Sequence, residues 1–244
     1  GAADHWEIAD RWIRNMFAEG QFTRTDWGHW LAEENRPGVV SPYSTTERVL
    51  QRNVGAFGSW LMPNDFYPVW PLDRESMHVG IMHCCTGNAT RAIYYAWENI
   101  LTYQKGKLNI NLLLNRASPW ADIDSYLPYE GQVDVKIKQA LELSIRIPEW
   151  TSLEKVYCQV NKEERLLSWD GLYAQIGAVK PNDNITLSFP MVTRKDNIEV
   201  QKRKYTIQRK GNEVVLIDPP GKSLPLYERA HYRKNKVRWK KTNR

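Results

Sequence analysis

Residues 141–147 read Leu141-Glu142-Leu143-Ser144-Ile145-Arg146-Ile147, with apolar side chains at every second position. Successive side chains of a strand point to opposite faces, so this alternation predicts a strand with one buried face. Similar short runs recur along the chain, at 108–112, 133–137, 156–160 and 185–189. Turn-forming residues separate them, at 129–131, 148–150, 169–171 and 180–183. Short alternating strands at this spacing predict an antiparallel β-sandwich.

The pattern before residue 104 is helical instead. Apolar side chains recur at helical spacing between Trp6 and Phe17. A second helix is expected to run to about Tyr103, after turn and capping residues at 86–88. Beyond the sandwich, two alternating runs flank Lys210-Gly211-Asn212 and predict a hairpin that opens a further β region.

The chain has 244 residues, of which 42% are hydrophobic, so it is long enough for more than one domain. We expect an α+β multidomain protein. Its predicted parts are a helical domain over 1–103, a β-sandwich over 104–195, and the start of a further β region with a basic tail over 196–244.

The net charge of +6 comes from the C-terminal end of the chain. Residues 229–244 carry eight Lys or Arg and no acid, which leaves 26 basic and 28 acidic residues in the rest of the chain. A basic tail with no nucleic-acid-binding motif predicts no nucleic-acid partner. The apolar runs are too short to span a membrane, and no signal peptide is evident; a signal could have been removed, so the compartment stays open.

Two adjacent cysteines, Cys84 and Cys85, stand at the expected start of the second helix. The positive end of a helix dipole favours thiolates, so this placement suits a reactive or metal-binding sulfur. Neighbouring cysteines rarely bridge each other, because the ring they would close is strained. Cys158 occupies an apolar place in an alternating run and is expected in the core. A redox or zinc-regulated protein is a further class, although the chain lacks a CxxC pattern.

The spacing Cys-Cys-x-x-Asn-x-x-Arg, at Cys84, Cys85, Asn88 and Arg91, resembles the β-L-arabinofuranosidase family, glycoside hydrolase family 127. The resemblance runs from about Trp6 to at least 217. It also includes the following helix, the strand at 108–114, and the β motifs at 143–150 and 183–191.

This resemblance implies the last helices of an α/α toroid, followed by a β-sandwich, in a bacterial retaining enzyme that removes arabinose or related sugars from glycans. In that family zinc is held by three cysteines and a glutamate, and a separate glutamate is the acid/base. By resemblance, Cys84 is the nucleophile and a zinc ligand, and Cys85 is a ligand only. The remaining family residues precede the segment that resembles Trp6 to Gln21. We therefore expect a C-terminal portion that carries part of the active site.

Other candidates surround the cysteine pair. His83 and His29 are candidate substrate-binding residues, because His83 adjoins Cys84 and His29 stands between Trp27 and Trp30. Ordinary structural hydrogen bonding is the alternative for both histidines. The sequence also offers His83, His78 and Glu75 as further zinc ligands. The expected partner is a carbohydrate, and a homodimer stays open. The alternative function is a noncatalytic carbohydrate-binding or structural β-sandwich protein derived from the same family.

Overall fold

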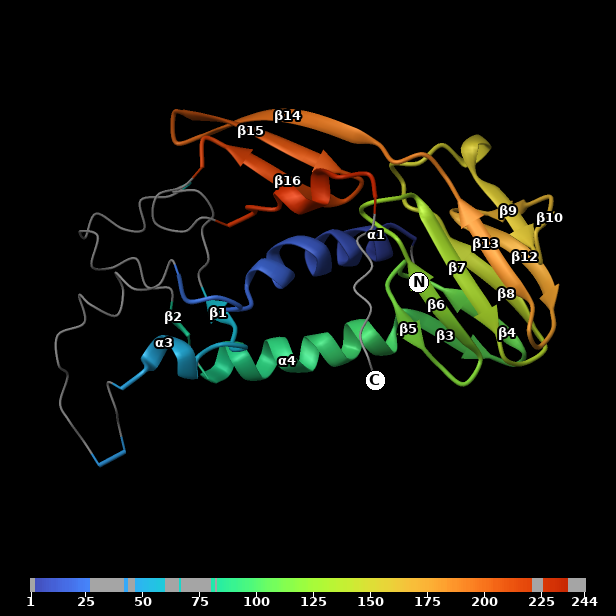
Figure 1. Cartoon of the computed structure of the whole chain (residues 1–244), viewed down its shortest axis with the longest axis horizontal. Coiled ribbons are helices and arrows are strands. Elements are labelled where there is room, and N and C mark those ends of the chain that lie inside the picture. The colour runs from blue at the N-terminus through green and yellow to red at the C-terminus, as the bar shows by residue number, and fades with distance from the viewer. Residues whose placement is uncertain are drawn as a thin grey trace.

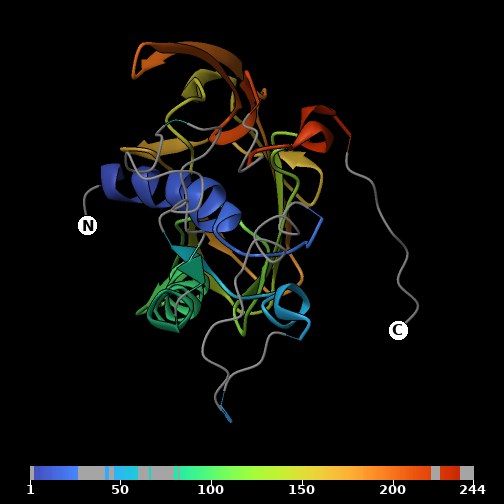
Figure 2. The ribbon, with the colours of Figure 1, turned by 90° about the vertical axis from the view of Figure 1, so that its left-hand side faces the viewer.

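The computed structural model describes residues 3–26, 42–43, 47–59, 66, 80–81, 83–220 and 226–236. These residues form two packed β-sheets, a separate three-stranded sheet and two long helices (Figure 1). Helix α1 (Ala3–Trp12) lies between the three-stranded sheet and helix α4 (His83–Glu98), as both views show (Figures 1 and 2). The described part is mostly β structure.

The sandwich consists of a six-stranded and a five-stranded sheet. The six-stranded sheet has the order β10 (Glu163–Glu164), β9 (Tyr157–Val160), β13 (Asn184–Ser188), β7 (Gln132–Ile137), β6 (Ala121–Ser125), β5 (Arg116–Ala117). The five-stranded sheet has the order β11 (Ser168–Asp170), β12 (Tyr173–Val179), β8 (Leu141–Arg146), β4 (Lys107–Ile110), β3 (Leu101–Gln104). All neighbouring strands are antiparallel except β4 and β8, which are parallel.

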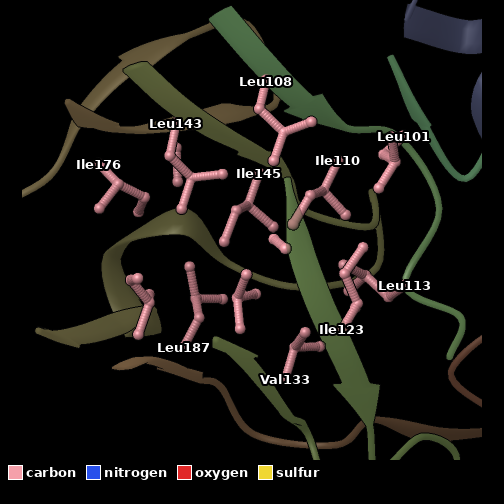
Figure 3. Packing of buried hydrophobic residues seen from close by; sticks show 14 of the residues in the cluster. Leu101, Leu108, Ile110, Leu113, Ile123, Val133, Leu143, Ile145, Ile176 and Leu187 are labelled. Atoms are coloured by element: carbon pink, nitrogen blue, oxygen red, sulfur yellow. The ribbon is translucent and has the colours of Figure 1, made fainter. Parts of the chain in front are cut away.

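The core of the sandwich confirms the strands predicted from alternation. Leu143 and Ile145 of β8 face Leu187 and Val133 of the other sheet, and all four are almost fully buried (Figure 3). Burying one such side chain contributes about 1.5–3 kcal/mol. The polar residues between them point away from this layer, and Ser144 donates a hydrogen bond to Gln175 on β12. The period of two therefore reflects real burial on one face.

Strands β6, β12 and β14 (Thr193–Val200) are not evident from the sequence pattern. In β12 the register against β8 shifts between Gln175 and Gly177, and Gly177 has a φ of +83°. That irregularity breaks the alternation. Strand β14 lies at the edge of its sheet and is mostly exposed, so its side chains need not be apolar.

The helices differ from expectation at their ends. Helix α1 is followed by the π-helix η1 (Ile13–Phe17), which confirms the predicted helix between Trp6 and Phe17. The expected extent of the second helix is wrong at both ends. It begins at His83, before the predicted capping residues, and it ends at Glu98 rather than near Tyr103. Residues 101–104 form β3 instead, because Leu101 is buried in the sandwich core.

The remaining elements are smaller. Strand β14 pairs with β15 (Arg203–Lys210), and β15 pairs with β16 (Glu213–Asp218), which confirms the predicted hairpin. The short elements are α3 (Val49–Arg52), β1 (Gly58–Ser59), β2 (Gly80–Ile81), η4 (Leu153–Lys155) and η5 (Ala230–Arg233). No helix in the described ranges is long and apolar enough to cross a bilayer.

A chain of buried ion pairs joins the helical segment to the three-stranded sheet. Arg14 donates to Asp10 at 2.7 Å and to Glu213 at 3.1 Å, and Arg229 reaches the other oxygen of Glu213 at 2.9 Å. Burial alone would lower the pKa of Arg14, but Asp10 and Glu213 outweigh it and the pKa is raised. The guanidinium therefore stays charged inside the protein.

A second buried pair joins α1 to the sandwich. Arg146 of β8 donates to Glu7 at 2.9 Å and to the carbonyl of Asn111 at 2.9 Å. The amide of Asn212 donates to both Glu7 and Asp10, at 2.7 Å each, and so links the two ion-pair systems. These contacts position α1 against both β units.

Candidate active site

The two cysteines lie in the first turn of α4. Cys84 is exposed and Cys85 is half-buried. Their Sγ atoms are 3.8 Å apart, so the sulfurs face each other without a disulfide. The start of a helix favours negative charge, because its unpaired N–H groups and dipole point there. This turn therefore offers two free thiols, side by side, at the start of a helix.

Contacts from a distant segment hold this turn in place. The hydroxyl of Thr86 accepts a hydrogen bond from the N–H of Phe57 at 3.1 Å and donates one to its carbonyl at 3.3 Å. Phe57 forms a β-bridge with Gln21, and its ring stacks on Phe17 with centroids 5.2 Å apart. The start of α4 is thus tied to the end of η1.

The two other motif residues brace the same turn. Asn88 donates to the carbonyl of Cys84 at 2.8 Å, and Arg91 donates to the side-chain oxygen of Asn88 at 2.6 Å. The three residues follow one another along one face of α4, at spacings of four and three. Asn88 and Arg91 therefore act as local supports for the backbone that carries Cys84.

Arg116 of β5 fixes the opposite end of α4. Its guanidinium donates to the carbonyls of Trp97 at 2.8 Å and Glu98 at 2.7 Å, and it lies 4.3 Å over the ring of Trp97. A cation at a helix C-terminus pairs with carbonyls that lack partners inside the helix. The cysteine-bearing helix is consequently anchored at both ends.

The cysteine pair fits two corners of a tetrahedral zinc site. Two sulfurs bound to one zinc ion at about 2.3 Å in tetrahedral geometry are about 3.8 Å apart. The distance between Cys84 Sγ and Cys85 Sγ is the same. Within the described residues, no group of three or more His, Cys, Asp or Glu side chains is placed to hold a metal. The pair therefore has the sulfur spacing of two such ligands.

The other sequence candidates are placed as follows. His83 is the first residue of α4, but its side chain is outside the described part of the structure. His29, His78 and Glu75 lie outside the described residues altogether. Cys158 is buried in β9, as expected, and burial raises the pKa of its thiol to about 11. Of the three cysteines, only the adjacent pair is accessible.

These environments predict two classes of thiol. With a disulfide-exchange reagent at pH 8, Cys84 and Cys85 should react promptly, whereas Cys158 should react at least about 100-fold more slowly because its thiolate is scarce and shielded. Unfolding in urea should release the third thiol. Peptide mass spectrometry after brief labelling identifies which cysteines react. Prompt labelling of Cys158 would contradict the buried placement.

Apolar side chains cover much of the surface of α1 and α4. Trp12, Ile93, Tyr95 and Trp97 are each more than 40% exposed. An apolar cavity of about 350 Å³ lies between the two helices, lined on the α4 side by Ala92, Tyr95 and Ala96. Clustered rings on helices are typical of surfaces that another element covers.

Comparison with known proteins gives matches among solved structures only. No model of a protein family and no curated protein matches the chain. Among solved structures it is similar to a glycoside hydrolase (22% identity, 59% of this chain and 26% of that one, TM-score 0.45). It is also similar to a GH127 β-L-arabinofuranosidase from Geobacillus stearothermophilus T6, with 21% identity over 72% of this chain and 27% of that one and a TM-score of 0.43. A third similar structure is a GH127 β-arabinofuranosidase, with 19% identity over 64% of this chain and 29% of that one and a TM-score of 0.48.

The chain spans 26–29% of the length of these three structures.

Proposed function

We propose that this chain is part of a retaining glycoside hydrolase for β-L-arabinofuranosides, in which Cys84 is the nucleophile. The observation that supports the proposal most is the exposed Cys84 sulfur, 3.8 Å from that of Cys85 in the first turn of α4. Asn88 and Arg91 complete the sequence spacing that resembles the family, and both brace that turn.

The reaction of such an enzyme has two displacement steps. In the first, the Cys84 thiolate forms a bond to the anomeric carbon while the bond to the leaving-group oxygen breaks, and an acid protonates that oxygen. In the second, water attacks the same carbon, loses a proton to the conjugate base, and the Cys84 sulfur leaves. Configuration at the anomeric carbon is retained because it inverts twice. By resemblance, the acid/base is a glutamate outside the described residues.

The first step requires ionised sulfur at Cys84. A thiol with an unperturbed pKa near 8.5 is mostly protonated at neutral pH. A bound zinc ion would keep a coordinating thiol deprotonated. Cys84 and Cys85 are the residues that would hold it, and Asn88 keeps the Cys84 backbone in position through its hydrogen bond to the Cys84 carbonyl. The ligand set is completed from outside the described residues.

We further propose that α1 and α4 are the last helices of an α/α toroid. The exposed rings of Tyr95 and Trp97, together with Ile93, support this, because they offer a surface for further helices. The chain would then carry one side of the active site. The three-domain division at residues 103 and 195 belongs to the same proposal.

Metal binding tests the proposal without requiring turnover. Cobalt(II) added to the chain should produce sulfur-to-metal charge-transfer absorption, because Co²⁺ occupies zinc sites held by thiolates. Cys84→Ala and Cys85→Ala should each lower the band by about half, since one of two thiolates is lost. The double variant should lack it, and added zinc should bleach it in the parent chain. As a matched control, Cys158→Ala should keep the full band, because Cys158 is buried in β9. A parent chain without the band would contradict the zinc site.

A further inference from the structure

A cavity of about 330 Å³ lies between α1 with η1 and the three-stranded sheet. Three arginines line it: Arg11 from α1, Arg194 from β14 and Arg209 from β15. Trp12 and Tyr227 add aromatic walls, and Asn212 adds a buried amide. None of these residues belongs to the motif that carries the cysteines.

The positive charges are crowded together by the fold. Arg194 is directly opposite Arg209 in the ladder between β14 and β15, so both side chains leave the same face of the sheet. Like charges at directly opposed positions destabilise a sheet. Burial lowers the pKa of Arg209, and the charges of Arg194 and Arg11 lower it further. The fold therefore gathers three guanidinium groups at one wall of the cavity, two of which share Asp196.

Local carboxylates neutralise the cluster only in part. Among the residues described, three carboxylates approach these guanidinium groups. Glu149 is 3.2 Å from Arg11, Glu7 is 3.6 Å from Arg11, and Asp196 contacts both Arg194 and Arg209. Glu7 is already paired with Arg146 at 2.9 Å. At this wall of the cavity three cations thus share two otherwise uncommitted carboxylates. The adjoining buried network of Arg14 and Arg229 with Asp10, Glu19 and Glu213 has one carboxylate more than its guanidinium groups, so the positive excess is local to the three arginines.

The other walls suit a ring with hydroxyl groups. Trp12 is 61% exposed and presents an aromatic side chain at the cavity. Asn212 is 5% exposed, and its Nδ2 donates to Glu7 and Asp10, which fixes the orientation of the amide. Its buried Oδ1 has no hydrogen-bond partner among the described residues. Buried polar atoms are normally paired, so this oxygen is an unused acceptor on a residue that lines the cavity.

We propose that this cavity binds a sugar that carries a carboxylate, a hexuronate unit of an acidic glycan. The guanidinium groups pair with the carboxylate, since Arg binds carboxylates through two parallel hydrogen bonds. The aromatic walls cover the apolar face of the ring, and Asn212 accepts from a hydroxyl group. The proposal rests on the proposed function only in taking the anion to be part of a glycan.

Calorimetric titration of the full chain with D-galacturonate, compared with D-galactose, tests the site at low ionic strength. Galacturonate should bind at least about tenfold more tightly than galactose, because only it carries the charge that the arginines neutralise. Arg194→Gln and Arg209→Gln should each weaken galacturonate binding at least about tenfold. Arg203→Gln is the matched control: it removes the same charge from the opposite end of β15 and should leave binding within about twofold.

Two further measurements distinguish a sugar site from unfolding and from simple anion binding. Arg194→Gln should melt no lower than the parent chain, because it removes a cross-strand repulsion; lost binding then does not reflect unfolding. Trp12→Ala should weaken binding of galacturonate but not of inorganic phosphate. Equal binding of phosphate and galacturonate, with no effect of Trp12→Ala, would overturn the sugar site in favour of a simple anion site. Absence of galacturonate binding at millimolar concentration would overturn the proposal outright.

The result is separable from the test of the proposed function. Cys84→Ala should bind galacturonate as the parent chain does, because the cavity lies against α1 and the three-stranded sheet rather than the start of α4. Loss of galacturonate binding in this variant would contradict the proposal that the cavity is a site separate from the cysteine pair. A chain that binds galacturonate but not cobalt would retain this site and lose the glycosidase proposal.

Discussion

Arg146→Met should lower the free energy of unfolding by about 3–5 kcal/mol, because it removes the buried cation of the Glu7 carboxylate and leaves only the more distant, partly exposed Arg11 at 3.6 Å. The side chains of Glu7 and Arg146 are 1% and 2% exposed, and their charged groups lie 2.9 Å apart. The same change removes the donor to the carbonyl of Asn111. Urea unfolding followed by tryptophan fluorescence measures the loss.

Two comparisons separate this effect from a general cost of replacing arginine. Arg24→Met removes an arginine whose partners, Asp26 and Glu228, are all largely exposed, and it should cost at most about 1 kcal/mol. The double variant Glu7→Leu with Arg146→Met should be more stable than Arg146→Met alone, because no unpaired charge stays buried. A loss below about 1 kcal/mol in Arg146→Met would show that the pair does not hold α1 against the sandwich.

Cys84→Ala should lower the release of dinitrophenolate from 2,4-dinitrophenyl β-L-arabinofuranoside by at least about 10³-fold, because the attacking atom is lost. This leaving group departs without protonation, so the first step needs the nucleophile but no acid. The zinc-loaded parent chain should therefore give a burst approaching one equivalent, even with the acid/base outside the described residues. Stopped-flow absorbance measures the burst, and intact mass spectrometry should find one pentosyl group per chain.

Two controls are the position of the pentosyl group in the chain and the behaviour of Cys85→Ala. Peptide mapping should place the pentosyl group on Cys84. Cys85→Ala should still acquire the group on Cys84, more slowly, because it loses a zinc ligand but keeps the nucleophile. An equal burst in Cys84→Ala and the parent chain would remove Cys84 from the mechanism. A parent chain with neither burst nor mass change would favour a fragment without an active site of its own, or a noncatalytic carbohydrate-binding or structural role.

The alternation of apolar and polar residues predicted most strands of the sandwich core. It did not predict the end of α4 or the arginines around the cavity, which depend on contacts between distant segments. The alternation of Leu143 and Ile145 follows directly from burial on one face. The predicted end of α4 was wrong because Leu101 belongs to the core of a sheet, and no nearby residue marks that change. The exposed cysteine pair was predicted as a candidate, whereas the arginines around the cavity were not, since each one alone looks like a surface charge.

The sequence by itself determined most strands of the sandwich core, the burial of Cys158, and the place of two adjacent thiols near the start of a helix. Each of these depends on neighbours within a few residues, so spacing is enough to predict it. Only the tertiary structure decided that β4 runs parallel to β8, that Glu7 meets Arg146, and that Arg194 meets Arg209 beside Arg11. Glu7 and Arg146 are 139 positions apart in the chain. Packing of the whole chain brings such residues together, because burial of shared apolar surface sets their distance and sequence spacing does not.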